Sequence, residues 1–86
     1  PSRSYNPDFI VETPDFIAMV ETKKKEDVDS EQVQVKAKAA INYCSNATEY
    51  NKQINGKPWK YILIPHDAVR LNMSLQYLFN QFEVTD

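Results

Sequence analysis

A turn signal between two apolar runs constrains this chain most strongly. Thr13-Pro14-Asp15-Phe16 places proline second and aspartate third, a pattern typical of a type I turn. The flanking runs have the composition of strands, so the segment 5–24 predicts a β-hairpin. If Pro14-Asp15 is a two-residue loop, Thr13 pairs with Phe16 and Asp8 lies opposite Glu21. On this register one sheet face collects a hydrophobic core of Phe9, Val11, Phe16, Ala18 and Val20.

The same register brings together Asp8, Glu21 and Lys23. Residues directly opposite each other lie on one face with Cβ atoms about 5 Å apart, and Lys23 shares the face of Glu21 by strand alternation. Charge beside a core is costly unless it is solvated, paired or bound to metal. The pattern is PD…ExK, and its two carboxylates are suited to sharing one Mg²⁺. It therefore predicts a divalent metal site for phosphodiester cleavage, and this prediction depends on a register without a bulge.

The tetrapeptide Pro-Asp-Phe-Ile occurs twice, so two aspartates compete for the role of metal ligand. It begins at Pro7 and again at Pro14. Asp15 fits the turn and is expected to face solvent at the far end of the hairpin, which leaves Asp8 as the predicted ligand.

Composition indicates a single domain, 1–86, of ordinary globular character. The chain has 42% hydrophobic and 26% charged residues, and the single Cys44 cannot form an internal disulfide. Neither a membrane-spanning stretch nor a signal peptide is evident, so we expect a cytoplasmic protein and no membrane partner. A net charge of −2 is unusual for a free-standing nucleic-acid binder. Either DNA affinity comes from elsewhere in a larger protein, or the chain is not a nuclease.

The remaining pattern predicts a helix, a strand and a second helix. Apolar residues recur at helical spacing over about 30–50, with Asp29 or Ser30 as the cap, after a charged loop at 25–30. A strand at 59–64 follows, expected to lie parallel to the second hairpin strand. The last helix spans about 67–82, with Asp67 as its cap and more apolar residues than one face holds. The fold class expected is α/β (α+β), with a mixed sheet.

With these elements in place, the chain resembles the carboxy-terminal endonuclease region of type III restriction enzymes, in their Res subunit. This region belongs to the PD-(D/E)XK nuclease superfamily, whose core has the same order of strand, strand, helix and strand. The resemblance covers nearly the whole chain and lies in the blocks Tyr5 to Phe9, Val20 to Lys23, Val35 to Ala40 and Lys57 to His66. It implies a restriction-endonuclease-like fold. The start at Pro1, without methionine, suggests a truncated nuclease core cut from a larger helicase–nuclease.

The resemblance also implies a function and its site. The function is Mg²⁺-dependent (Mn²⁺ is an alternative) cleavage of double-stranded DNA, with ATP used by a helicase domain of the same polypeptide and a methyltransferase (Mod) subunit as partner. Asp8 and Glu21 would be metal ligands, the Thr22 carbonyl a third, and Lys23 would orient or activate the attacking water. Departures are Lys24 where many relatives have glycine, and the lack of an upstream acidic helix and of a Gln-x-x-x-Tyr helix signature.

Two other interpretations remain open: a catalytically silent nuclease-like domain that docks or contacts DNA within a helicase, and a coincidental motif with no metal site. Secondary candidates for function are His66 as a base and the early helix residues Gln32, Gln34 and Lys36, which would reach DNA or the nucleophilic water. The simpler interpretation is a capping or loop residue for His66 and an ordinary exposed first helical turn for the other three.

Overall fold

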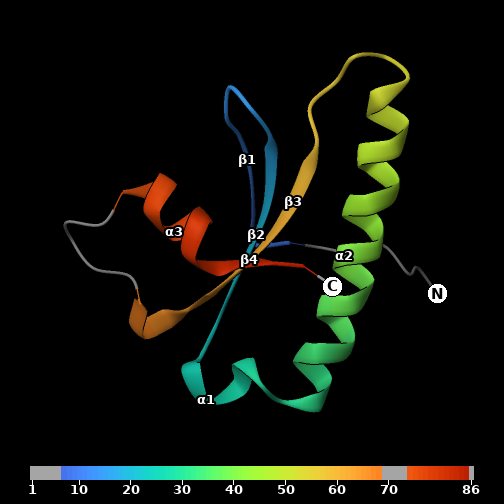
Figure 1. Ribbon diagram of the computed structural model, residues 1–86. Helices are drawn as coiled ribbons and strands as arrows, with labels where there is room; N and C mark the ends of the chain where they lie inside the picture. Colours follow the sequence, from blue (N-terminus) through green and yellow to red (C-terminus); the bar gives the residue numbers. More distant parts are fainter. Residues whose placement is uncertain (1–6, 69–73, 86) are drawn as a thin grey trace.

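The computed structural model describes residues 7–68 and 74–85, and these form a small mixed α/β domain of the expected class. The sheet has four strands in the order β1-β2-β3-β4, and the longer helices pack around it (Figure 1). The strands are β1 (Phe9–Glu12), β2 (Ile17–Lys23), β3 (Trp59–Pro65) and β4 (Glu83–Val84). The helices are α1 (Lys25–Val28), α2 (Glu31–Lys52) and α3 (Leu75–Phe82), with a 3₁₀ turn, η1, at His66–Ala68.

The hairpin has the register that the sequence predicts. Phe9 pairs with Val20 in an antiparallel β1–β2 ladder without a bulge. The Thr13 amide donates to the Phe16 carbonyl at 2.8 Å, and the Thr13 hydroxyl accepts from the Phe16 amide at 3.0 Å. These bonds close a two-residue loop in which Asp15 is exposed, as expected of a turn residue. The predicted hairpin limits were too wide, since pairing begins at Phe9, and residues 5 and 6 lie outside the described segments.

Helix α2 carries the chain across the sheet, so that β2 and β3 run parallel as predicted. The Ser30 hydroxyl caps it by accepting from the Val33 amide at 3.2 Å, which decides between the two predicted caps. The expected loop at 25–30 was wrong in part. Lys25–Val28 forms the short helix α1, whose turn begins with the Asp27 amide donating to the Lys24 carbonyl at 2.9 Å.

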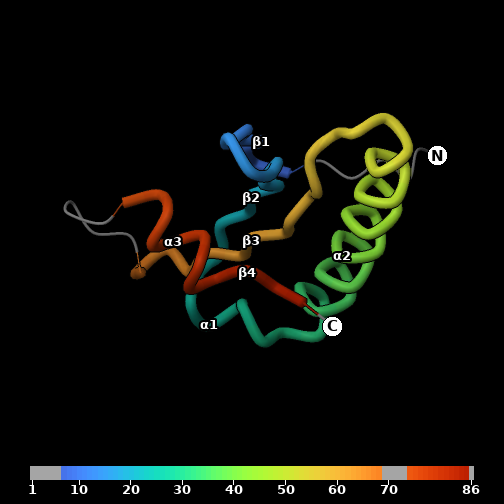
Figure 2. The backbone as a smooth tube through the Cα atoms, turned by 45° about the horizontal axis from the view of Figure 1, so that its top comes forward, coloured from blue at the N-terminus to red at the C-terminus, as the bar shows by residue number. Residues whose placement is uncertain are grey.

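The sheet is covered by α3 on one face and by α2 on the other (Figure 2). Alternating side chains of β2 and β3 supply both layers, as expected for inner strands. Phe16, Ala18, Val20, Ile62, Ile64, Leu78 and Phe79 form the layer under α3. Met19, Val33, Ala37, Ala40, Cys44, Tyr61 and Leu63 form the layer under α2.

Phe9 was wrongly placed in the core. It is 58% exposed, and Val11 is only partly buried, whereas the predicted core residues of β2 are buried. The reason is that β1 is an edge strand, and α3 packs over the inner strands.

The C-terminal segment differs most from expectation. Asp67 lies in η1 and does not cap a helix over 67–82; Ser74 caps α3, its hydroxyl accepting from the Tyr77 amide at 3.1 Å. Leu78 is buried but Leu75 is 59% exposed, so α3 buries one face rather than several. Val69, Leu71 and Met73 lie outside the described residues. After α3, the edge strand β4 pairs antiparallel with β3, and no pattern in the sequence predicts this strand. Among the helices described, none is long and apolar enough to cross a membrane.

Candidate metal-binding site

The Asp8 carboxylate lies against the backbone of β2 between the other two motif residues. Asp8 immediately precedes β1, and its Oδ2 atom accepts from the Thr22 amide at 2.9 Å and from the Thr22 hydroxyl at 3.1 Å. Thr22 stands between Glu21 and Lys23 in β2. Asp8 therefore lies at the same end of the hairpin as Glu21 and Lys23, opposite the turn. By strand alternation, the Thr22 hydroxyl that it contacts lies on the other face of β2 from the Glu21 and Lys23 side chains. The role of the Thr22 amide and hydroxyl was not foreseen, because the prediction concerned only its carbonyl.

Glu21 and Lys23 lie on the α2 side of the sheet, on the same face as Met19 by strand alternation. Glu21 is only 6% exposed, and its Oε2 atom is 3.6 Å from Lys23 Nζ. That distance is too long for a good hydrogen bond, so the pair acts through charge. A carboxylate so buried requires such compensation, since desolvation disfavours an isolated charge.

The residues present fit a magnesium ion by the chemistry of their donors. Carboxylate oxygens are hard ligands, and both described hydrogen bonds of Asp8 use the same oxygen, Oδ2. Mg²⁺ in proteins is commonly held by one or two carboxylates, with water and substrate phosphate completing its shell. Residues 7–68 and 74–85 contain no group of three or more His, Cys, Asp and Glu side chains that could hold a metal ion.

A hollow of about 230 Å³ adjoins the motif at Lys23. It lies between the end of β2, α1 and the first two turns of α2. Its lining residues are Lys23, Asp27, Ser30, Gln32, Val33 and Lys36. Two of the early α2 candidates, Gln32 and Lys36, thus line the hollow. The third does not, because Gln34 Nε2 donates to the Val28 carbonyl at 2.8 Å.

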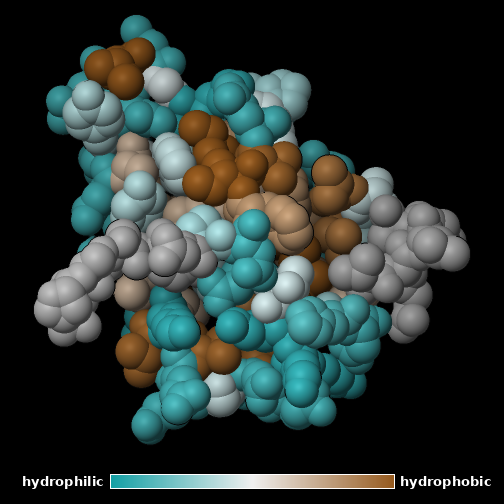
Figure 3. Space-filling view, turned by 180° about the vertical axis from the view of Figure 1, so that it is seen from behind, coloured by the Kyte–Doolittle hydropathy of each residue, from teal (hydrophilic) through white to brown (hydrophobic). Residues whose placement is uncertain are grey.

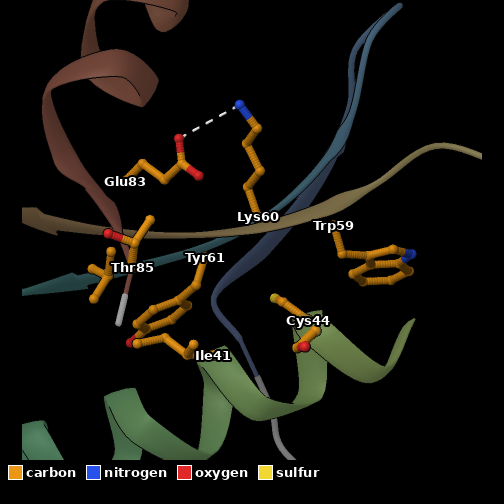
Figure 4. Close-up of a pocket in the computed structure, with 9 residues that line it drawn as sticks. Ile41, Cys44, Trp59, Lys60, Tyr61, Glu83 and Thr85 are labelled. Carbon is orange, nitrogen blue, oxygen red and sulfur yellow. Dashed lines mark ion pairs between the residues drawn. The ribbon is translucent and has the colours of Figure 1, made fainter. Parts of the chain in front are cut away.

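A second hollow, of about 170 Å³, lies between the middle of α2, β3 and β4 (Figure 4). Cys44 lines it from α2, and the Lys60–Glu83 ion pair (3.5 Å) projects from the opposite side of β3. The Cys44 thiol donates to Met19 Sδ at 3.7 Å, and burial raises its pKa to about 11. Cys44 is thus the buried small hydrophobe that its place on the apolar stripe of the helix predicts. His66 is exposed in η1.

Comparison of the chain with models of protein families, with curated proteins and with solved structures finds no match.

Proposed function

We propose that this chain is a Mg²⁺-dependent endonuclease domain that cleaves phosphodiester bonds of double-stranded DNA. The observation that carries the proposal is the contact of Asp8 Oδ2 with the Thr22 amide at 2.9 Å. It brings a carboxylate from one strand to the Glu21-Thr22-Lys23 segment of the next. Thirteen residues of intervening chain would not produce this contact without the hairpin register. Mn²⁺ would serve in place of Mg²⁺.

The chemistry divides among three side chains. Asp8 and Glu21, with the Thr22 carbonyl as third ligand, would hold the ion. When bound, Mg²⁺ supplies Lewis-acid stabilisation of the negative charge that develops on the phosphate. Lys23 would orient the attacking water and offset charge at the scissile phosphate. In the overall hydrolysis the water oxygen bonds to phosphorus while the bond to one deoxyribose oxygen breaks; the water loses a proton and the leaving oxygen gains one.

The wider setting that we propose is the Res subunit of a type III restriction system in the cytoplasm. Strand, strand, helix and parallel strand occur here in the order of the PD-(D/E)XK core, which supports a restriction-endonuclease-like fold. In that setting a helicase domain of the same polypeptide uses ATP, and a methyltransferase (Mod) subunit is the partner. The low net charge of this chain agrees with DNA affinity supplied largely by such neighbours.

Nicking of a supercoiled plasmid tests the activity, and the repeated tetrapeptide provides its matched control. We expect nicking in Mg²⁺ or Mn²⁺ by the wild type and by Asp15→Asn, which alters the turn aspartate. Asp8→Asn, which changes the same residue type in the same local sequence, is expected to lose activity about 10³-fold, equivalent to several kcal/mol of transition-state stabilisation. Equal activity of the two variants would contradict the role of Asp8.

A catalytically silent docking domain is the second candidate, and one observation favours it. Phe9 and Ile10 on the edge strand β1 are each 58% exposed. In the view from behind, apolar surface gathers over this part of the molecule (Figure 3). Large exposed apolar patches often mark interaction sites. A docking domain predicts no metal-dependent nicking by the wild type, whereas an endonuclease requires it.

A further inference from the structure

Two α2 side chains lie across the hollow from the motif lysine. Gln32 and Lys36 are one helical turn apart, so they project on the same side of α2. Both line the 230 Å³ hollow together with Lys23. Because Lys23 Nζ is also 3.6 Å from Glu21 Oε2, the hollow adjoins the Glu21–Lys23 pair of the candidate metal-binding site.

The charges around the hollow single out Lys36. Lys23 is paired with Glu21, and Lys25 forms an ion pair with Asp67 at 3.9 Å. Among residues 7–68 and 74–85, no ion pair involves Lys36. An ammonium group beside a site for a scissile phosphate is suited to a neighbouring phosphate of the same strand, which a lysine contacts as a point charge. The amide of Gln32 adds a neutral hydrogen-bond donor.

We infer that Lys36, assisted by Gln32, contacts a backbone phosphate that neighbours the scissile phosphate on the same DNA strand. This inference rests on the endonuclease function proposed above. Lys36 is therefore a DNA-positioning residue, and the hollow takes the phosphate backbone. Asp27 lines the same hollow and opposes the phosphate through like charge.

The test is the salt dependence of DNA binding, measured by fluorescence anisotropy of a labelled duplex in Ca²⁺, which carboxylates bind as a hard cation. Each phosphate contact contributes about 0.9 to the slope of log affinity against log salt concentration. We expect Lys36→Ala to weaken binding and to make the slope shallower by about 0.9. Lys38→Ala removes an exposed lysine two residues along α2 that does not line the hollow, and is expected to leave the slope unchanged.

Two further variants separate charge from other effects. Gln32→Ala is expected to weaken binding without changing the slope, because a neutral side chain displaces no counterion. Asp27→Asn is expected to strengthen binding by removing like charge. If the wild type binds but Lys36→Ala and Lys38→Ala have the same slope, the inference about Lys36 is overturned while the endonuclease function stands. If the wild type neither binds nor nicks DNA, both fail.

Discussion

At the scale of single residues, the candidate site depends on where two carboxylates lie. Asp8 is exposed and is anchored through Thr22, whereas Glu21 is buried under α2 with Lys23 as its cation. If the buried Glu21 carboxylate is a metal ligand, the stability of the folded protein depends on metal binding. An ion that binds only the folded protein stabilises it by mass action.

Glu21→Gln is expected to abolish stabilisation by Mg²⁺. At an ion concentration about 100 times the dissociation constant, the wild type is expected to gain about 2.7 kcal/mol in its free energy of unfolding. Urea unfolding in Mg²⁺ and in chelator measures this gain. Glu12→Gln, which alters a carboxylate of β1 near the turn, is the control and is expected to keep it. A Mg²⁺ effect of equal size in both variants would exclude Glu21 as a ligand.

Cys44 predicts a loss of stability at high pH. Its thiol has its pKa raised by burial from 9.0 to about 11, so the folded state keeps the proton that the unfolded state releases first. The contribution of this thiol to stability is therefore complete below pH 9 and falls as pH rises from about 9 to 11. The difference in unfolding free energy between wild type and Cys44→Ala, followed across this range, is expected to decline. A difference independent of pH would contradict a raised pKa.

At the scale of elements, β3 is the strand on which the packing depends. It lies between β2 and β4, and its side chains alternate between the two layers, with Tyr61 facing α2 and Ile62 facing α3. The packing does not depend on the edge strand β1 in this way, although β1 also carries large apolar residues.

Ile62→Val is expected to destabilise the domain by about 0.5–1.5 kcal/mol, because the side chain is fully buried and its lost methyl group leaves space in the core. The same substitution at Ile10, which is 58% exposed, is expected to change stability by less than about 0.5 kcal/mol. Urea midpoints of the two variants measure the difference. Equal losses of stability in the two variants would indicate that Ile10 in β1 is as deeply buried as Ile62 in β3.

Local sequence patterns were sufficient to predict the elements whose structure depends on residues close together in the chain. The Pro14-Asp15 turn determined the hairpin register, and the α2 stripe of Val33, Ala37, Ala40 and Cys44 is buried as its spacing predicts. The same register brings Asp8 near the segment that contains Glu21, Thr22 and Lys23. The contact that forms there is with Thr22, which the sequence pattern did not predict.

The structural features that the sequence did not predict depend on tertiary contacts between elements. Phe9 is apolar and follows the core alternation, but its exposure is decided by which strand α3 covers. The two-residue β4 has no pattern of its own and exists because β3 offers an edge beside it. Likewise, Lys23 at the end of β2 and Lys36 on α2 line the same hollow, and no local sequence motif predicts that they lie close together.

At the scale of the whole molecule, the apolar core and the polar motif residues lie in different parts of the domain. Two helices cover the faces of the sheet (Figure 1). The motif residues stand where β1 begins and β2 ends, at the end of the hairpin away from its turn. The chain has a net charge of −2, so binding of a cation at this end would reduce repulsion of the DNA backbone. Metal binding is therefore the central step of the proposed function, because both the proposed DNA contact and the proposed cleavage would depend on it.

Titration of Mg²⁺ into isotopically labelled protein, followed through amide chemical shifts, tests whether the hairpin end binds a metal ion. We expect saturable shifts clustered at Asp8, Glu21, Thr22 and Lys23, retained in Asp15→Asn and lost in Asp8→Asn. Shifts that are absent, that are spread over the acidic surface, or that persist unchanged in Asp8→Asn would contradict a metal site at this end of the hairpin.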